Sequence, residues 1–171
     1  HSAAKPLLDK LVARREEQAA YLSEVKLRLL RTKGNPQRGR RVFFSKKAAC
    51  AGCHRMEDQG GIVGPELSHI GRLRSSADLV EAVIFPSSSI ALGYEPYTIA
   101  TNDGRVHSGI IVRETSDAVY LRTAQLAEIR IPRGEVDEMN RSHVSIMPQG
   151  LEKSLNDQDL SDLLEFLYSL K

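Results

Sequence analysis

The sequence of 171 residues predicts a mainly α-helical fold with an inserted small antiparallel β-sheet or barrel and an extra N-terminal helix. Three observations lead to this prediction: apolar residues recur with helical spacing near both ends, strand-like alternation is confined to the middle, and Gly and Pro residues separate the elements. The expected organisation is an N-terminal helix or linker from an upstream region (1–33), two parts of one helical domain (34–93 and 141–171), and the β insertion between them (94–140).

The N-terminal stretch predicts one helix over residues 6–31, because Pro6 suits a first helical position and leucine and valine residues fall near one stripe. The stripe is thin in its middle, so we expect this helix to be a linker or the tail of an upstream domain. Gly34 and Pro36 interrupt the pattern, and a second helix should begin near Pro36 and run towards Cys50.

Beyond Cys50 the sequence predicts a glycine-rich loop and then a short helix, which Ser75 or Ser76 caps and Pro86 ends. The stretch "SLNDQDLSDLLEFLYSL" near the end of the chain predicts a capped amphipathic helix. The apolar faces of these two helices consist of Leu79, Val80, Val83 and Ile84, and of Leu160, Leu163, Leu164 and Leu167.

The period of the sequence changes from helical to alternating at about Tyr94. Residues with strand composition flank Asp103 and Gly104, a pair that is typical of a tight β-hairpin turn. The stretches "AVYLRT" and "AEIRIP" continue the alternation, so residues 94–140 should hold four or five short strands.

Composition and charge narrow the class of protein. No run of eighteen or more apolar residues exists, which excludes a membrane-spanning helix of ordinary length. Residues 1–60 hold 14 Lys and Arg against six Asp and Glu, whereas residues 61–171 hold 10 against 16. Because the basic residues alternate with glutamates, we interpret them as a solvated helix face rather than a nucleic-acid surface. No cleavable signal sequence is visible, and the opening "HSAAKP" suggests a piece of a longer protein.

The stretch "CAGCH" contains both cysteines of the chain, Cys50 and Cys53, and ends in His54. Three interpretations compete: a redox dithiol, half of a metal site, or an attachment point for a c-type haem. A thioredoxin-type dithiol follows a buried strand, which this sequence lacks, and a zinc site needs four ligands. No second Cys or His pair exists, since the other histidines are isolated: His1, His69, His107 and His143.

Four stretches give the sequence a resemblance to a known family: "GRRVF" before "CAGCH", "GPELSHIG" after it, "SIMPQGLEKSL", and "DLSDLLEFLYSL". With them, residues 34–171 resemble the class I cytochromes c, and more narrowly the haem-binding domain at the C-terminus of many planctomycete and verrucomicrobial proteins. The stretch "FPSSSIALGYEPYTIATNDGRVHSGIIV" matches this narrower group, whose β insertion precedes a Met-Pro element.

The resemblance implies one covalently attached haem c. Cys50 and Cys53 would form thioether bonds to the porphyrin, and His54 would bind the iron from one side. Met147, which directly precedes Pro148, matches the distal thioether ligand. These two ligands are 93 positions apart, which is longer than a minimal cytochrome needs, and the excess corresponds to the β segment.

The resemblance also assigns supporting residues. The carbonyl of Pro65 should accept a hydrogen bond from Nδ1 of the haem histidine, which would fix its tautomer, and Leu67 should pack on the ring. Gly39 and Phe43 correspond to positions where the first helix of the haem domain crosses the last helix.

Three residues compete with Met147 as distal ligand. Met56 lies two residues beyond the haem histidine and therefore on the same side of the iron, and Met139 lacks the following proline. His143 is the serious rival, because it would give a bis-histidine haem with a lower potential.

The expected function is one-electron transfer between a partner, a dehydrogenase or a fused dehydrogenase domain, and an acceptor, without catalysis by the chain itself. The alternative is a haem-based gas or redox sensor, or a peroxidase, in which the distal Met is displaced. The β segment resembles an Sm-like or SH3-like barrel, but it is acidic and lacks an aromatic cluster, so no nucleic-acid partner is expected. Lys46 and Lys47 could steer an acidic partner. Haem attachment implies a periplasmic or otherwise extracytoplasmic location.

Overall fold

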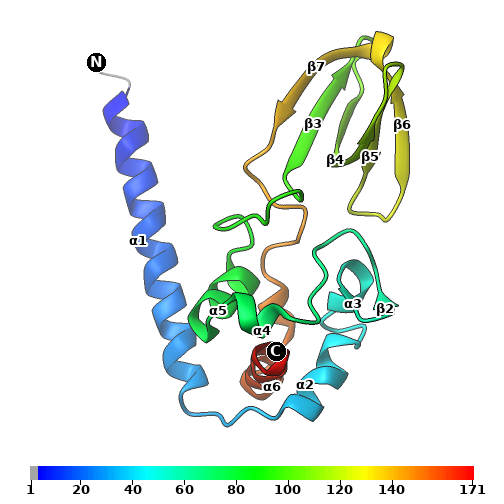
Figure 1. The fold of residues 1–171 in the computed structure, drawn as a ribbon. Coiled ribbons are helices and arrows are strands. Elements are labelled where there is room, and N and C mark those ends of the chain that lie inside the picture. The colour runs from blue at the N-terminus through cyan, green and yellow to red at the C-terminus, as the bar shows by residue number, and fades with distance from the viewer. Residues whose placement is uncertain (1–3) are drawn as a thin grey trace.

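The computed structural model describes residues 4–171, in which helices gather at one end and a five-stranded sheet forms the other (Figure 1). The helices are α1 (Ala4–Leu29), α2 (Pro36–Phe43), α3 (Cys50–Cys53), α4 (Ile70–Leu73), α5 (Ser76–Ile84) and α6 (Asp157–Ser169), with 3-10 turns η1 (Arg133–Glu135) and η2 (Leu151–Ser154). The strands are β1 (Arg55–Met56), β2 (Gln59–Gly60), β3 (Pro96–Thr101), β4 (Val106–Glu114), β5 (Ala118–Arg122), β6 (Glu128–Pro132) and β7 (Val136–Arg141).

The prediction of a mainly α, cytochrome c-type helical fold is wrong. The chain is 42% helical and 21% strand, with a five-stranded antiparallel sheet and a second sheet of two strands. The physical reason is that the strands build a hydrophobic cluster of their own, separate from the cluster of the helices. The individual helices and strands nevertheless lie within a few residues of their predicted positions.

The helical region is built on the crossing of α2 and α6, which lie on opposite sides of the five-stranded sheet in the sequence. Gly39 allows this crossing, because a Cβ atom there would collide with the carbonyl group of Asp162 and lie 2.6 Å from Cβ of Phe166. The rings of Phe43 and Phe166 meet edge to face at 5.9 Å between centroids. The expected contact of Gly39 and Phe43 with the last helix is thus confirmed.

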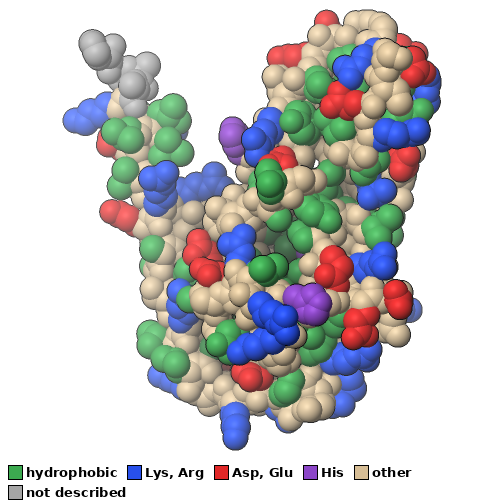
Figure 2. Space-filling model, viewed as in Figure 1, with side chains coloured by type: hydrophobic (Ala, Val, Ile, Leu, Met, Phe, Trp, Pro, Cys, Tyr) green, Lys and Arg blue, Asp and Glu red, His purple; other side chains and the backbone are tan. Residues whose placement is uncertain are grey.

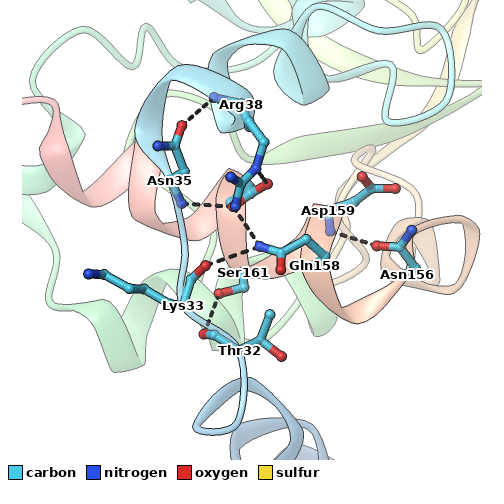
Figure 3. Close-up of polar contacts among 9 residues, drawn as sticks. Thr32, Lys33, Asn35, Arg38, Asn156, Gln158, Asp159 and Ser161 are labelled. Carbon is cyan, nitrogen blue, oxygen red and sulfur yellow. Dashed lines mark hydrogen bonds and ion pairs between the residues drawn. The ribbon is translucent and has the colours of Figure 1, made fainter.

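The carboxylate of Asp162 anchors the link between α1 and α2 to α6, although its side chain is only 3% exposed. Its oxygens accept hydrogen bonds from the Asn35 N–H (2.7 Å), from Nε and Nη2 of Arg38 (2.6 and 2.8 Å) and from Nε2 of Gln158 (2.9 Å). Figure 3 shows the surrounding side chains, including Ser161, whose hydroxyl donates to the Thr32 carbonyl. A buried charge with this many donors is fully compensated.

The long helix α1 has two different halves. Near its C-terminal end Val25 is only 1% exposed and packs in the helical cluster, and Arg28 pairs with Asp157 at the start of α6. The N-terminal half extends away from the rest of the molecule and exposes Leu7, Leu8, Leu11 and Val12 (Figures 1 and 2). No described helix is both long and apolar enough to cross a lipid bilayer.

The larger sheet has the strand order β6-β5-β4-β3-β7, and every neighbouring pair is antiparallel. The predicted turn at Asp103–Gly104 joins β3 to β4, and Gly104 adopts the positive φ of 82° that glycine tolerates. Successive side chains of a strand point to opposite faces of the sheet, and four side chains on one face are buried in a hydrophobic cluster, namely Ile99, Val119, Leu121 and Ile131.

One hydrogen bond joins the sheet to the helical region, and two others hold the segments that lead into and out of the sheet. The chain enters and leaves the sheet at one place, where the Ser142 N–H donates to the Pro96 carbonyl at 2.7 Å. Nη1 of Arg122, at the end of β5, donates to the Ile62 carbonyl at 3.0 Å. The Ser145 N–H donates to the hydroxyl of Ser87, which follows α5, at 3.0 Å.

Candidate functional site

Both cysteines of the chain lie on the single turn of α3, with unpaired thiols that are half-buried. Ala49, which precedes this turn, adopts the left-handed conformation (φ 55°) that non-glycine residues rarely use. The strained residue redirects the chain after α2, so that Cys50 and Cys53 begin and end the turn. Gly52 stands between them, and a Cβ atom at this position would meet nothing within 4 Å.

His54 directly follows α3, and its ring is held on two sides. Nδ1 lies 2.8 Å from the Pro65 carbonyl oxygen, to which it donates a hydrogen bond as the neutral tautomer requires. Gly64 lies against the ring, since a Cβ atom there would be 2.5 Å from Cε1 and 3.0 Å from Nε2. With Nδ1 occupied, Nε2 is the nitrogen that remains available for a further bond.

The loop that carries Gly64 and Pro65 folds back on α3. After the tight β1–β2 hairpin, the Gly61 N–H donates to the Ala51 carbonyl and the Gly64 N–H donates to the Cys53 carbonyl, each at 2.8 Å. A Cβ atom at Gly61 would collide with the backbone of α3. The glycines of the loop therefore permit a backbone approach that other residues would prevent.

Burial controls the ionisation of the site. It raises the pKa of the Cys50 thiol to about 11, so the thiol is protonated at neutral pH. Burial also lowers the pKa of the His54 imidazole, and the hydrogen bond to Pro65 opposes this only in part. A redox dithiol needs a cysteine with a depressed pKa, which is the opposite of what burial does to Cys50. The neutral imidazole, by contrast, is the form that binds a metal ion.

A zinc site finds no support in the described part of the chain. In residues 4–171, no group of three or more His, Cys, Asp and Glu side chains is arranged to hold a metal ion. Of the histidines other than His54, His69 and His143 are exposed, and His107 is half-buried on β4. His1 lies outside the described residues.

The other predicted site residues occupy distinct environments. Leu67 is half-buried against the helical cluster, close to the loop of Pro65. Met147 is half-buried in the segment that connects β7 to η2, and its N–H donates to the Ser145 hydroxyl at 3.2 Å. Of its rivals, Met56 is buried in the helical cluster and Met139 packs against the sheet cluster. These two thioethers are thus already engaged in packing.

Sequence reasoning missed two residues, one in the loop that folds against His54 and one that follows β5. Gly64 contacts the His54 ring, and the signal that could have found it is its place directly before Pro65. Thr123, at the end of β5, is buried with a hydroxyl that has no hydrogen-bond partner. No local pattern distinguishes Thr123, because it is far from His54 in the sequence.

The donor set fits a covalently attached haem. Two reduced thiols flank one helical turn, a histidine with its Nδ1 occupied follows at once, and the glycine against its ring leaves no side chain between ring and loop. The comparisons with known proteins found no match: no family model matches the chain, and no curated protein matches its sequence. The resemblance to cytochromes c stays a prediction from the motifs.

Proposed function

We propose that the chain binds one c-type haem through Cys50 and Cys53, with His54 as an axial ligand, and that it transfers single electrons. The observation that supports this most is the hydrogen bond from Nδ1 of His54 to the Pro65 carbonyl at 2.8 Å. Histidines that bind metal ions commonly donate their other ring nitrogen in this way, because the bond fixes the tautomer and raises the basicity of the ligating nitrogen.

The residues around the histidine would each contribute a defined property. Burial keeps the imidazole of His54 neutral, so that Nε2 presents a free lone pair. Gly64 and the carbonyl of Pro65 restrict rotation of the ring from two sides. The half-buried thiols of Cys50 and Cys53 supply the two sulfur atoms for thioether bonds, and no other cysteine competes for them.

Met147 is the distal ligand in this proposal. Its segment is held by the bonds of Ser142 to Pro96 and of Ser145 to Ser87, so the thioether is carried by a fixed stretch of chain. When bound, a haem with histidine and methionine ligands supplies reversible one-electron chemistry and leaves no open iron position. The chain would then exchange electrons with a dehydrogenase partner and an acceptor, outside the cytoplasm where haem attachment takes place.

The test is to produce the protein in a host that matures c-type cytochromes. We expect an intact mass equal to the polypeptide plus one haem, and a pyridine haemochrome spectrum of a haem with two thioether bonds. Replacing both Cys50 and Cys53 by Ser should abolish the covalent haem. A colourless protein with the mass of the bare polypeptide would contradict the proposal.

The distal ligand is tested separately. The ferric protein should show the weak far-red absorption band of an iron–methionine bond, and the band should disappear in Met147→Leu but persist in the matched variant Met139→Leu. If the ferrous protein bound carbon monoxide readily as isolated, a sensor or peroxidase with a displaceable ligand would replace electron transfer as the assignment. If His143→Ala removed low-spin coordination instead, the ligand pair would be bis-histidine.

A further inference from the structure

A cleft of ≈ 490 Å³ lies between the sheet and the segment that leads to Met147. Its walls come from the first residues of β4, from the turn that joins β5 to β6, and from residues 142–146. Ile129 and Ile146 supply apolar surface, and Ser108 and Thr123 supply hydroxyl groups. The volume is in the range of about 300–1,000 Å³ that is usual for cofactor and small-molecule sites.

The cleft borders the segment that leads to Met147, and Arg122 links its other side to the loop that follows β2. On one side, residues 142–146 line it and run directly into Met147. On the other side, Thr123 lines it, and the preceding residue Arg122 is hydrogen-bonded to the Ile62 carbonyl at 3.0 Å. Ile62 belongs to the loop that holds Pro65 against the haem histidine. The sheet is thereby linked to the loop that holds Pro65.

Thr123 is the residue of this cleft whose buried side chain lacks a hydrogen bond. Its side chain is only 7% exposed, and Oγ1 has no hydrogen-bond partner. Its backbone is fixed, because its N–H donates to the Ala127 carbonyl at 2.9 Å and its carbonyl accepts from the Leu126 N–H at 3.1 Å. A buried hydroxyl without a partner is costly, so such a group indicates a missing acceptor or donor.

We propose that this cleft receives the carboxylate-bearing edge of the haem, and that the Thr123 hydroxyl donates a hydrogen bond to a haem carboxylate. This inference rests on the proposed function. No Asp or Glu lies among the described residues that line the cleft, so a carboxylate meets no like charge there. Ser108, Ser142 and Ser145 add further hydroxyl groups, and the aliphatic side chains suit the edge of a porphyrin ring. The β segment then shapes the haem environment.

The charged and titratable groups near Thr123 are few. His107 lines the same cleft from β4, and Arg122 and Glu128 face each other across β5 and β6 at 3.7 Å. The ionisation of a haem carboxylate in the cleft would couple to the redox state of the iron, and the midpoint potential would then depend on pH. A hydrogen bond from Thr123 favours the charged carboxylate and holds its pKa down.

The experiment compares the mature wild-type protein with Thr123→Val, and uses Thr123→Ser as the matched variant that retains the hydroxyl. The midpoint potential is measured against pH, also in a His107→Gln background that removes the neighbouring imidazole. We expect Thr123→Val to move the pH-dependent step upward by about one unit, and Thr123→Ser to leave it in place. The urea midpoint of Thr123→Val should fall, since a haem carboxylate loses its donor.

Each outcome has one meaning. A wild-type protein without haem overturns the proposed function, whereas a haem protein with the same pH profile and urea midpoint in Thr123→Val overturns only this inference. An increase in stability does the same, because valine would then simply remove an unpaired buried hydroxyl. Disappearance of the step in His107→Gln alone would assign it to the imidazole. A shift of the step on adding succinate would assign the cleft to a free carboxylate, against the proposal.

Discussion

The helical region and the five-stranded sheet bury their apolar side chains in two clusters that the chain assembles in opposite ways. The helical cluster combines Val25 from α1, Phe43 from α2 and Leu163 from α6, which are far apart in the sequence. The buried members of the sheet cluster all come from β3, β5 and β6, which belong to one continuous segment of 46 residues from Pro96 to Arg141. The helical region therefore depends on contacts between residues that are far apart in the sequence, whereas the sheet is built from one continuous segment.

This difference shows which contacts determine the stability of each region. The helical region depends on a few long-range contacts that have no substitute, such as the approach of Gly39 to Asp162 and the carboxylate of that aspartate. The sheet depends on a small dry cluster, and its ion pairs lie on the surface. Variants in each region can therefore separate the stability of one from that of the other.

The largest effect is expected for Gly39→Ala in the helical region. The added Cβ would collide with backbone atoms of Asp162, which cannot move without separating α2 from α6. Overpacking of this kind should lower the free energy of unfolding by about 3 kcal/mol or more. Urea unfolding followed by circular dichroism measures it. The control is Gly134→Ala, where the Cβ meets nothing and the change should stay within about 0.5 kcal/mol. Equal stability of both variants would contradict the crossing.

The next effect is expected for Leu121→Ala in the sheet. Leu121 is fully buried, so truncation should cost about 2–4 kcal/mol. Amide hydrogen exchange in residues 96–141 should accelerate roughly hundredfold, while α2 and α6 keep their protection. The control is Leu92→Ala, at a leucine that is 92% exposed, which should change neither region. If both regions lost protection equally, they would be one cooperative unit and the comparison would fail.

A smaller effect is expected for Asp162→Asn, which removes the buried charge but keeps the shape. The hydrogen bonds of Arg38 and Asn35 would weaken, and we expect a loss of about 2 kcal/mol at pH 7. Urea unfolding measures this loss. The control is Asp137→Asn, the same substitution at an exposed aspartate in β7, which should have almost no effect.

The pH dependence of this variant follows from the ionisation of Asp162. Burial raises the pKa of its carboxyl, but the hydrogen bonds from Arg38, the Asn35 N–H and Gln158 together outweigh burial and hold the pKa below its usual value. The unfolded chain therefore takes up the proton first. The stability from this group is present above the usual pKa of about 3.9 and is lost as the pH falls through the folded value. The difference between wild type and Asp162→Asn should shrink towards pH 3, and a constant difference would contradict the ionic role.

The smallest effect is expected for Lys47→Ala. The amine of Lys47 pairs with Asp159 at 2.6 Å, but both groups are accessible to solvent. Such pairs contribute about 0.5 kcal/mol or less, and the contribution should vanish at about 1 M salt. The matched variant in the sheet is Arg130→Ala, which removes an exposed pair with Asp117, also at 2.6 Å. A loss above about 1 kcal/mol in either region would show that its surface charges are more coupled than their exposure indicates.

Local pattern predicted the elements of this protein but not how they combine. The caps and turns at Ser75, Pro36 and Gly104 appear where the sequence places them, because each depends on neighbouring residues only. The fold class was wrong, since periodicity shows which face of a strand is apolar but not whether the strands share a core with the helices. Asp162 reads as a polar position of an amphipathic helix, and its burial depends on Arg38, 124 positions away.

The geometry around His54 was predicted in part. Cys50, Cys53 and His54 are adjacent in the sequence, and the contact of Pro65 with the histidine follows a motif. The burial of the Thr123 hydroxyl and the bond from Arg122 to Ile62 required the three-dimensional structure, because that bond joins the sheet to the loop across 60 positions. No spacing in the sequence reports such a contact.

The hydrogen bond between Ser142 and Pro96 has an evolutionary consequence. Because the two ends of the β segment meet, the whole segment can be exchanged, lengthened or shortened as a cassette while the surrounding chain keeps its path. Mutation can thus vary the strands at little risk to the cysteine turn. A lineage could diversify the surroundings of an unchanged cysteine turn by exchanging the segment between these two residues.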